Sequence, residues 1–188
     1  MTDLGPILSL WHELESAGTG YVLATIVAIE GSSYRRPGAR MLLAQDGRRA
    51  GTVSGGCLEA EVARRSWWLT GSGPVVERYS TVEDDGDRPY GSGCGGVVYL
   101  LLERAATASA HLAALESAFL ARTPIAIATI LDGPQIGTRA IAGLPVGSGS
   151  ASNHDLKTLA DRALLESISF EERIAIDGVS TRVWVDHE

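Results

Sequence analysis

The chain has 188 residues, of which 45% are hydrophobic, and this is enough for a globular domain with a sizeable core. Its formal net charge of −7 argues against a general nucleic-acid binder, because a phosphate backbone favours a basic protein face. No basic stretch followed by an apolar one opens the chain, and no apolar run approaches the ~20 residues of a membrane helix. We therefore expect a cytoplasmic protein that binds neither nucleic acid nor membrane.

The first half of the sequence predicts a helix, then a buried strand and a hairpin. Apolar residues at helical spacing indicate an amphipathic helix over Leu4–Ala17. Tyr21–Ile29 is almost continuously apolar and rich in β-branched residues, which is typical of a strand covered on both faces. The Asp46-Gly47 pair predicts a hairpin turn. The hairpin strands, a helix and two further strands are expected, in this order, at Arg40–Ala44, Ala50–Val53, Leu58–Leu69, Val75–Tyr79 and Val97–Leu102.

The second half repeats short motifs of the first half in the same order. Ala24–Ile26 has the same sequence as Ala128–Ile130. Gly38–Arg40 is echoed by Gly137–Arg139. The other correspondences are Gly51–Ser54 with Gly147–Ser150, Leu58 with Leu156 at a helix start, and the closing strands of the first half with Phe170–Ile176 and Thr181–Val185. The alternative is chance similarity between short apolar strings.

Repetition of this kind predicts an α/β fold with a mixed β-sheet and flanking helices, built from two ββαββ-like pseudo-repeats. The repeats are expected at about residues 20–104 and 124–186, within a single domain that covers residues 1–188. Ile125–Leu131 is expected to be a buried strand, like its counterpart in the first repeat.

The two repeats differ in the residues before their helices. In the first repeat, Ser54, Gly55, Gly56 and Cys57 precede the second helix, and such residues are not needed for an ordinary helix cap. The corresponding Ser152–Asp155 predicts an ordinary N-cap, in which Asn153 or Asp155 serves the free amides. Glycines let a backbone approach a ligand, and a helix start favours an anion. The same field lowers a thiol pKa, so Cys57 is a candidate nucleophile or soft-metal ligand. The alternative is a buried residue that only packs under the helix.

The second cysteine, Cys94, lies in a glycine-rich segment. Gly91–Gly96 fits the pattern G-x-G-x-x-G, but a dinucleotide site needs a strand before the motif and a helix after it. Here an acidic stretch precedes the motif and a predicted strand follows. We therefore expect no NAD or FAD site, and interpret the segment as a loop in which Gly95 and Gly96 bring Cys94 close to a ligand. The alternative is an ordinary connection.

A third segment, from Gly31 to Gly38, follows the first buried strand. Serine hydroxyls, backbone amides and arginine guanidinium groups are suited to holding an oxyanion. The candidate binding residues here are Gly31, Ser32, Ser33, Arg36, Gly38 and, just beyond, Arg40. A solvated loop without a ligand is the alternative.

These three segments together resemble the XdhC/CoxI family. Gly31–Met41, Gly51–Glu59 and Gly93–Gly96 are similar to three signatures of that family in order and approximate spacing. The resemblance is strong up to Glu103 and fainter beyond it. Many members continue into a C-terminal Rossmann domain, whereas this sequence ends at Glu188, so the resemblance covers the N-terminal domain only.

The resemblance implies a chaperone that binds molybdenum cofactor as cargo and helps to protect, sulfurate or insert it into a xanthine or CO dehydrogenase-type hydroxylase. The implied contacts to the cofactor are Gly31, Ser32, Ser33, Arg36, Gly38, Arg40, Ser54, Gly55, Gly56, Cys57, Cys94, Gly95 and Gly96, with Cys57 and Cys94 as candidate molybdenum ligands. A cysteine desulfurase and a second copy of the chain are further candidate partners.

Two other functions are weighed against a carrier without turnover. One is a thiol-dependent enzyme that transfers sulfur to the cofactor through Cys57 or Cys94 as the catalytic residue. The other is an adaptor between proteins whose thiols play no part. The carrier is the favoured hypothesis, and the chain is expected not to be an enzyme.

Overall fold

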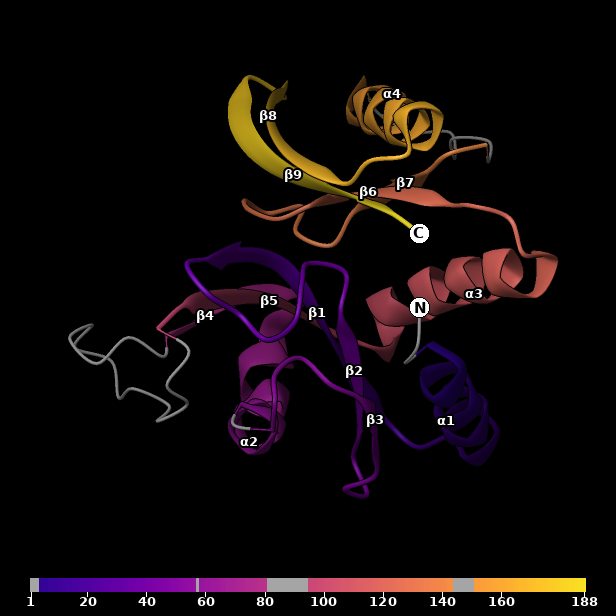
Figure 1. Cartoon of the computed structure of the whole chain (residues 1–188), viewed down its shortest axis with the longest axis vertical. Coiled ribbons are helices and arrows are strands. Elements are labelled where there is room, and N and C mark those ends of the chain that lie inside the picture. Colours follow the sequence, from indigo (N-terminus) through magenta and orange to yellow (C-terminus); the bar gives the residue numbers. More distant parts are fainter. Residues whose placement is uncertain (1–3, 57, 81–94, 144–150) are drawn as a thin grey trace. The chain divides into compact units, whose positions relative to one another are not determined.

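The computed structural model describes residues 4–56, 58–80, 95–143 and 151–188. The chain divides into two compact units, Met1–Ser109 and Ala110–Glu188, coloured indigo to magenta and orange to yellow (Figure 1). None of the helices in the described part of the chain combines the length and the apolar character that crossing a bilayer requires.

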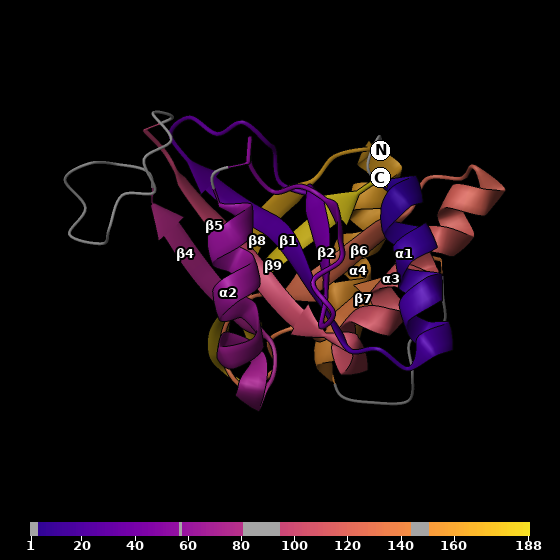
Figure 2. The ribbon, with the colours of Figure 1, turned by 90° about the horizontal axis from the view of Figure 1, so that it is seen from below.

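The first unit is a five-stranded sheet with a helix against it. Its strands lie in the order β3-β2-β1-β5-β4, and each neighbouring pair is antiparallel. The elements of this unit are α1 (Leu4–Ala17), β1 (Tyr21–Glu30), β2 (Arg40–Ala44), β3 (Arg49–Gly51), α2 (Glu59–Leu69), the short 3-10 helix η1 (Thr70–Ser72), β4 (Val75–Ser80) and β5 (Val97–Arg104). Figure 2 shows α2 lying across the sheet.

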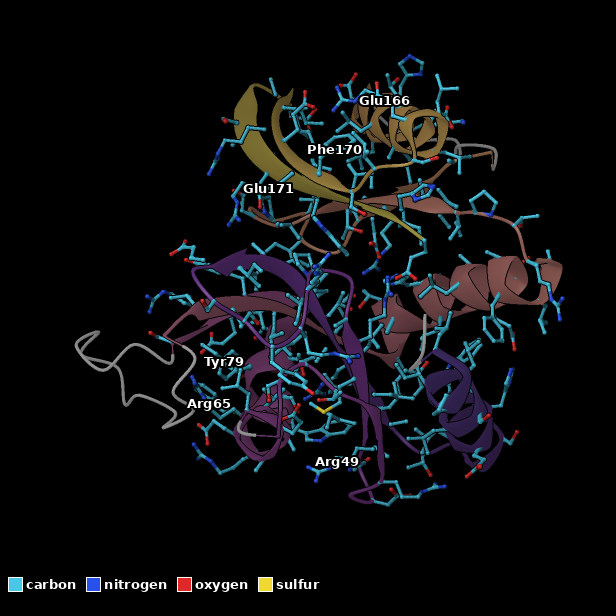
Figure 3. The ribbon with its side chains drawn as sticks, viewed as in Figure 1. Arg49, Arg65, Tyr79, Glu166, Phe170 and Glu171 are labelled. Carbon is cyan, nitrogen blue, oxygen red and sulfur yellow. The ribbon has the colours of Figure 1, made fainter. Side chains whose placement is uncertain are left out.

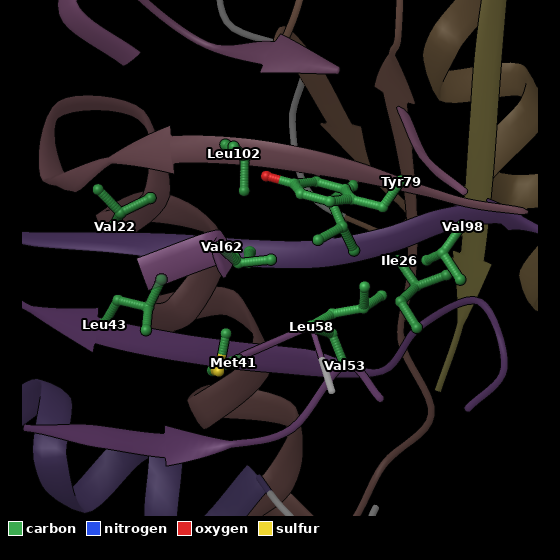
Figure 4. Close-up of a cluster of buried hydrophobic side chains, with 12 residues drawn as sticks. Val22, Ile26, Met41, Leu43, Val53, Leu58, Val62, Tyr79, Val98 and Leu102 are labelled. Atoms are coloured by element: carbon green, nitrogen blue, oxygen red, sulfur yellow. The ribbon is translucent and has the colours of Figure 1, made fainter. Parts of the chain in front are cut away.

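The core of this unit forms between α2 and alternate residues of the strands. Val22 and Ile26 of β1 point to the same face of the sheet and pack with Leu58 and Val62 at the start of α2 (Figure 4). The opposite face is also buried, and Tyr21 there accepts a hydrogen bond of 2.9 Å from Trp11 of α1. Burial of both faces explains why β1 lacks the polar alternation of a half-exposed strand.

The second unit has the same design, with four strands in its described residues. Its sheet has the order β7-β6-β9-β8, again with antiparallel neighbours. The remaining elements are α3 (Ala105–Ala121), which spans the boundary of the units, β6 (Ala126–Ile130), β7 (Arg139–Ile141), α4 (Ala151–Glu166), β8 (Phe170–Ile176) and β9 (Val179–His187). A core forms between α4 and the sheet, and the Arg162 guanidinium of α4 lies 4.1 Å from the ring centre of Phe170, labelled in Figure 3.

The two pseudo-repeats are confirmed by strand order and register. The order β2-β1-β5-β4 of the first unit matches β7-β6-β9-β8 of the second. Thr25 pairs with Arg40 in one sheet, and Thr129 pairs with Arg139 at the equivalent place in the other. The loop between these strands closes in the same way too, because the N–H of Gly38 donates to Ile26 at 2.9 Å and that of Gly137 donates to Ile130 at 3.0 Å.

The fold class is confirmed as α/β, but the strands form two antiparallel sheets where the sequence predicted a mixed one. The reason is the course of the helical connections. Each of α2 and α4 leads from one outermost strand of its sheet to the other outermost strand, so no strand returns beside a parallel neighbour. Whether the two units act as the single domain expected from the sequence stays a prediction.

Two local expectations were wrong. The helix α3 was not predicted at all. The helix α4 begins at Ala151, so Asn153 and Asp155 lie inside it and do not form a cap before it. Polar residues of this kind favour both a cap and the first helical turn, and from His154 onwards Leu156 is the first buried residue of the helix. The echo of Gly51–Ser54 at residues 147–150 lies outside the described residues.

Candidate functional site

Two of the glycine-rich segments leave the first sheet side by side. Glu30, the last residue of β1, pairs with Val97, the first residue of β5. A Cβ atom on Gly96 would overlap the carbonyl oxygen of Ser32 and lie 2.9 Å from that of Glu30. A Cβ on Gly31 would lie 3.1 Å from the carbonyl oxygen of Gly95, and the φ of Gly31 is +70°. The two backbones therefore touch at a place where only glycine fits without movement.

A cross-strand contact fixes the point where these segments begin. The Tyr99 hydroxyl of β5 donates a hydrogen bond of 2.8 Å to the Glu30 carboxylate. This bond to a negative acceptor, more than partial burial, raises the pKa of Tyr99 above its usual value, so the hydroxyl keeps its proton. The start of the Gly31–Gly38 loop is thus tied to β5 as well as to β1.

The third segment, which precedes α2, joins the other two through Tyr34. A Cβ on Gly55 would lie 3.6 Å from Cγ and 3.8 Å from both Cδ atoms of the Tyr34 ring. Three ring atoms at nearly equal distance mean that the ring lies with its face toward Gly55. The Gly31–Gly38 loop therefore lies next to each of the other two glycine-rich segments in the first unit.

Within the third segment, most of the described amide groups are already taken by side chains of the segment itself. The N–H groups of Val53 and Ser54 donate to Oε1 of Glu59, at 3.2 and 2.8 Å. The N–H groups of Gly56 and Leu58 both donate to the Ser54 hydroxyl oxygen at 3.1 Å. The hydroxyl groups of Ser54 and Thr52 in turn donate to the Glu59 carboxylate. The anion that this helix start holds in the structure is its own glutamate.

The charge of Glu59 is maintained by these bonds. Burial raises the pKa of the carboxyl group, but hydrogen bonds from Ser54, Thr52 and the backbone outweigh burial, so the pKa is lower than usual. Glu59 also stands in the first turn of α2, where the helix dipole favours a negative charge. These bonds therefore favour the charged carboxylate, which ties the start of α2 to the loop before it.

The arginines differ in accessibility. Arg40 begins β2 and is 5% exposed, and its Nη1 donates a hydrogen bond of 2.9 Å to the carbonyl oxygen of Gly38. Arg40 thus supports the end of the Gly31–Gly38 loop. Arg36 is exposed on the same loop, and its carbonyl oxygen accepts from the N–H of Ala39 at 3.1 Å. The Arg36 guanidinium is the better placed of the two to meet an anion from solvent.

The structure places most, but not all, of the candidate residues. It brings Gly31, Ser32, Gly95 and Gly96 into contact, and links Gly55 to them through Tyr34. Cys57 and residues 91–94, including Cys94, lie outside the described residues, so the role of both thiols stays a prediction. In the described part of the chain, no three His, Cys, Asp or Glu side chains gather closely enough to hold a metal ion.

Three residues that support or complete this arrangement were not among the candidates. Glu59 and Thr52 complete the hydrogen bonds around Ser54, and Tyr34 joins two loops. An acid in the first turn of a helix is so common that it gave no special signal. An aromatic residue in a loop of serine, glycine and arginine was the one signal that could have identified Tyr34.

The fold is thus an α/β protein built from two repeats. In the first repeat, the Gly31–Gly38 loop lies next to the other two glycine-rich segments. Residues 14–80 match the model of the XdhC and CoxI family. The resemblance expected from the sequence is thereby confirmed.

Two curated relatives and one solved structure extend this finding. The chain is 42% identical over 85 residues to a protein of Bacillus subtilis (strain 168) that is named as a probable xanthine dehydrogenase subunit, covering 44% of this chain and 26% of that protein. It is 36% identical over 122 residues to "Molybdenum cofactor insertion chaperone PaoD" of Escherichia coli (strain K12), covering 60% and 35%. A crystal structure of a xanthine dehydrogenase from Bacillus halodurans matches with a TM-score of 0.58 and 31% identity, covering 71% of this chain and 41% of that one. This chain thus spans about a third or less of the length of the curated relatives.

Proposed function

We propose that this chain binds molybdenum cofactor as cargo and holds it for insertion into a molybdenum hydroxylase of the xanthine or CO dehydrogenase type. The observation that carries the proposal is that the Gly31–Gly38 loop lies next to both other glycine-rich segments, because Gly31 meets Gly95 and Gly96 and the Tyr34 ring faces Gly55. The similarity to a protein named as a molybdenum cofactor insertion chaperone supports it.

The chemistry of these loops suits parts of the cofactor in different ways. Its phosphate needs a cation with hydrogen-bond donors, and the exposed guanidinium of Arg36 supplies both. The segment before α2 is less suited to the phosphate, because Glu59 and the Ser54 hydroxyl already occupy its amides. We therefore place the phosphate at Arg36 and keep the metal at the thiols of Cys57 and Cys94, as the sequence suggested.

Holding cargo, with no turnover, is the function proposed. In this role the chain has to bind the cofactor, shield it from water and release it on the target enzyme. Sulfur transfer would need a persulfide on Cys57 or Cys94, and no described residue favours that reaction. A cysteine desulfurase partner, a homodimer, a cytoplasmic location and the lack of an NAD or FAD site all stay predictions.

Arg36→Gln is the sharpest test of this proposal. The second repeat already has glutamine at the equivalent place, since Gln135 accepts from Thr138 as Arg36 accepts from Ala39, so the loop backbone keeps its geometry. The protein should be produced with cofactor biosynthesis active, and its molybdenum and pterin content measured per chain. We expect near-stoichiometric loading of the wild type and about tenfold weaker retention by the variant, because one charge-assisted bond is lost.

The control is Arg173→Gln, which removes the same charge from an exposed position in the second unit. This variant should retain as much cofactor as the wild type. A wild-type protein that carries neither molybdenum nor pterin from such cells would refute the carrier function. Equal losses in the two arginine variants would show that net charge, and not the Gly31–Gly38 loop, attracts the cofactor.

A further inference from the structure

The side chain of Tyr34 is exposed in a way that packing does not explain. The residue is 73% exposed, although it stands in a loop whose neighbours on both sides make backbone contacts. One face of its ring lies against Gly55, which is a bare backbone without a side chain to cover it. A large aromatic side chain is thus held out over the meeting point of two loops with much of its surface in water.

Gly55 faces one side of the Tyr34 ring and does not enclose it. Atoms of the ring lie 3.6–3.8 Å from where a Cβ of Gly55 would be, which is ordinary van der Waals contact. The glycine therefore offers a flat support on one side and leaves the other side of the ring available.

Flat aromatic ligands bind to such a surface by stacking. An aromatic ring and a planar heterocycle prefer an offset, face-to-face arrangement. Each such stacking contact strengthens binding by a measurable amount. The guanidinium of Arg36, two residues further along the same loop, is exposed and could hold an anionic group of the same ligand.

We propose that Tyr34 is a specificity-determining residue that stacks on the fused heterocycle of the cargo, namely the pterin. This inference rests on the proposed function, since it assigns one part of the cofactor to one side chain. Selection then works by shape and charge together. The ring of Tyr34 selects a flat heterocycle, and Arg36 selects the anionic group attached to it.

Two substitutions at one position separate stacking from simple apolar burial. Tyr34→Phe keeps the aromatic face, whereas Tyr34→Leu keeps apolar area and loses the face. After production in cells that make the cofactor, Tyr34→Phe should retain as much pterin per chain as the wild type. Tyr34→Leu should retain at least about fivefold less. Trp68→Leu is the matched control, because Trp68 of α2 is a similarly exposed aromatic residue (77%) and should have no effect.

A titration with free pterin-6-carboxylate, followed by fluorescence anisotropy, distinguishes this inference from the proposed function. If the wild type acquires no cofactor in cells, the proposed function fails, and the titration alone decides whether Tyr34 binds a pterin. If the wild type is loaded and Tyr34→Leu is loaded equally, the carrier function stands and the stacking inference is overturned. Thermal unfolding of each variant checks the fold, and an exposed side chain predicts unchanged midpoints.

Discussion

The two repeats of this chain connect their last two strands by loops of very different length. In the second unit β8 and β9 are joined by a turn of Asp177 and Gly178, whose φ angles of 51° and 79° match a type I′ hairpin. In the first unit the equivalent strands β4 and β5 are joined by the much longer segment 81–96. A hairpin turn would suffice for the fold, so the long connection in the first repeat points to a role other than folding.

The helices that follow show a second difference. Leu58 and Leu156 hold equivalent buried places at or near the start of α2 and α4. The residue after each is Glu59 in the first repeat and Lys157 in the second. Glu59 is buried and accepts bonds from the loop before it, whereas the Lys157 ammonium bonds at 2.8 Å to Asp161 on its own helix. At this position the first copy has a buried carboxylate that closes the preceding loop, and the second copy has a lysine that pairs within its own helix.

The largest effect is expected from Gly96→Ala. The added methyl group would overlap the backbone of Ser32, and a backbone cannot move aside as a flexible side chain can. We expect a loss of about 3 kcal/mol in the free energy of unfolding, at the upper end for overpacking, measured by urea denaturation. Gly71→Ala is the control in the same unit, because nothing lies within 4 Å of its added Cβ, and it should change little.

The turn of the second repeat provides the comparison for Gly96. Gly178→Ala meets no atom within 4 Å, but its φ of +79° is unfavourable for alanine. The expected cost is about 1 kcal/mol. If Gly96→Ala proves no more harmful than Gly178→Ala, the two glycine-rich segments of the first unit do not touch.

Glu59→Gln should have the next largest effect. An amide can accept from Val53 and Ser54 but cannot also accept from the Ser54 hydroxyl, so one buried hydrogen bond is lost. We expect about 1–3 kcal/mol of destabilisation at neutral pH. Lys157→Gln is the control from the second repeat and should cost less than about 0.5 kcal/mol, as expected for a helix-surface ion pair.

Acid should remove the same contribution from the wild type. The pKa of Glu59 is lower in the folded chain than its usual value, so its bonds stabilise the fold above the unfolded pKa of about 4.3. That stability is lost as the pH falls through the folded pKa. The difference between wild type and Glu59→Gln should therefore shrink below about pH 4. A constant difference from pH 7 to pH 3 would mean that Glu59 is not charged in the fold.

Much of the fold could be predicted because its signals are local. Leu4–Ala17, Arg40–Ala44 and Phe170–Ile176 form elements with the boundaries expected from periodicity and turn residues. The helix α3 was missed because its run of alanine, serine and leucine gives little contrast between faces. Strand pairing was the other failure, since periodicity reveals a strand but not the direction of its neighbour.

The site was only partly predictable, for a related reason. A cluster of glycines is conspicuous in a sequence, because glycine is used where the backbone turns sharply or approaches another group closely. Gly31, Gly95 and Gly96 do meet in this way. The role of Glu59 depends on a turn that brings its carboxylate back to the residues before the helix. No spacing rule for an ordinary cap predicts that return.

The smallest effect is expected from Gln135→Arg, which gives the second repeat the arginine of the first. Gln135 donates a weak bond of 3.4 Å to Asp177, and an arginine could pair with that carboxylate at the surface. Stability should therefore change by no more than about 0.5 kcal/mol. Molybdenum and pterin content should also stay at the wild-type value, because the adjoining β8–β9 connection is a short turn that offers no glycine-rich partner loop. A second equivalent of cofactor bound by this variant would show that one arginine is enough to create a binding site in the second repeat. The glycine-rich loops of the first repeat would then not be needed for binding.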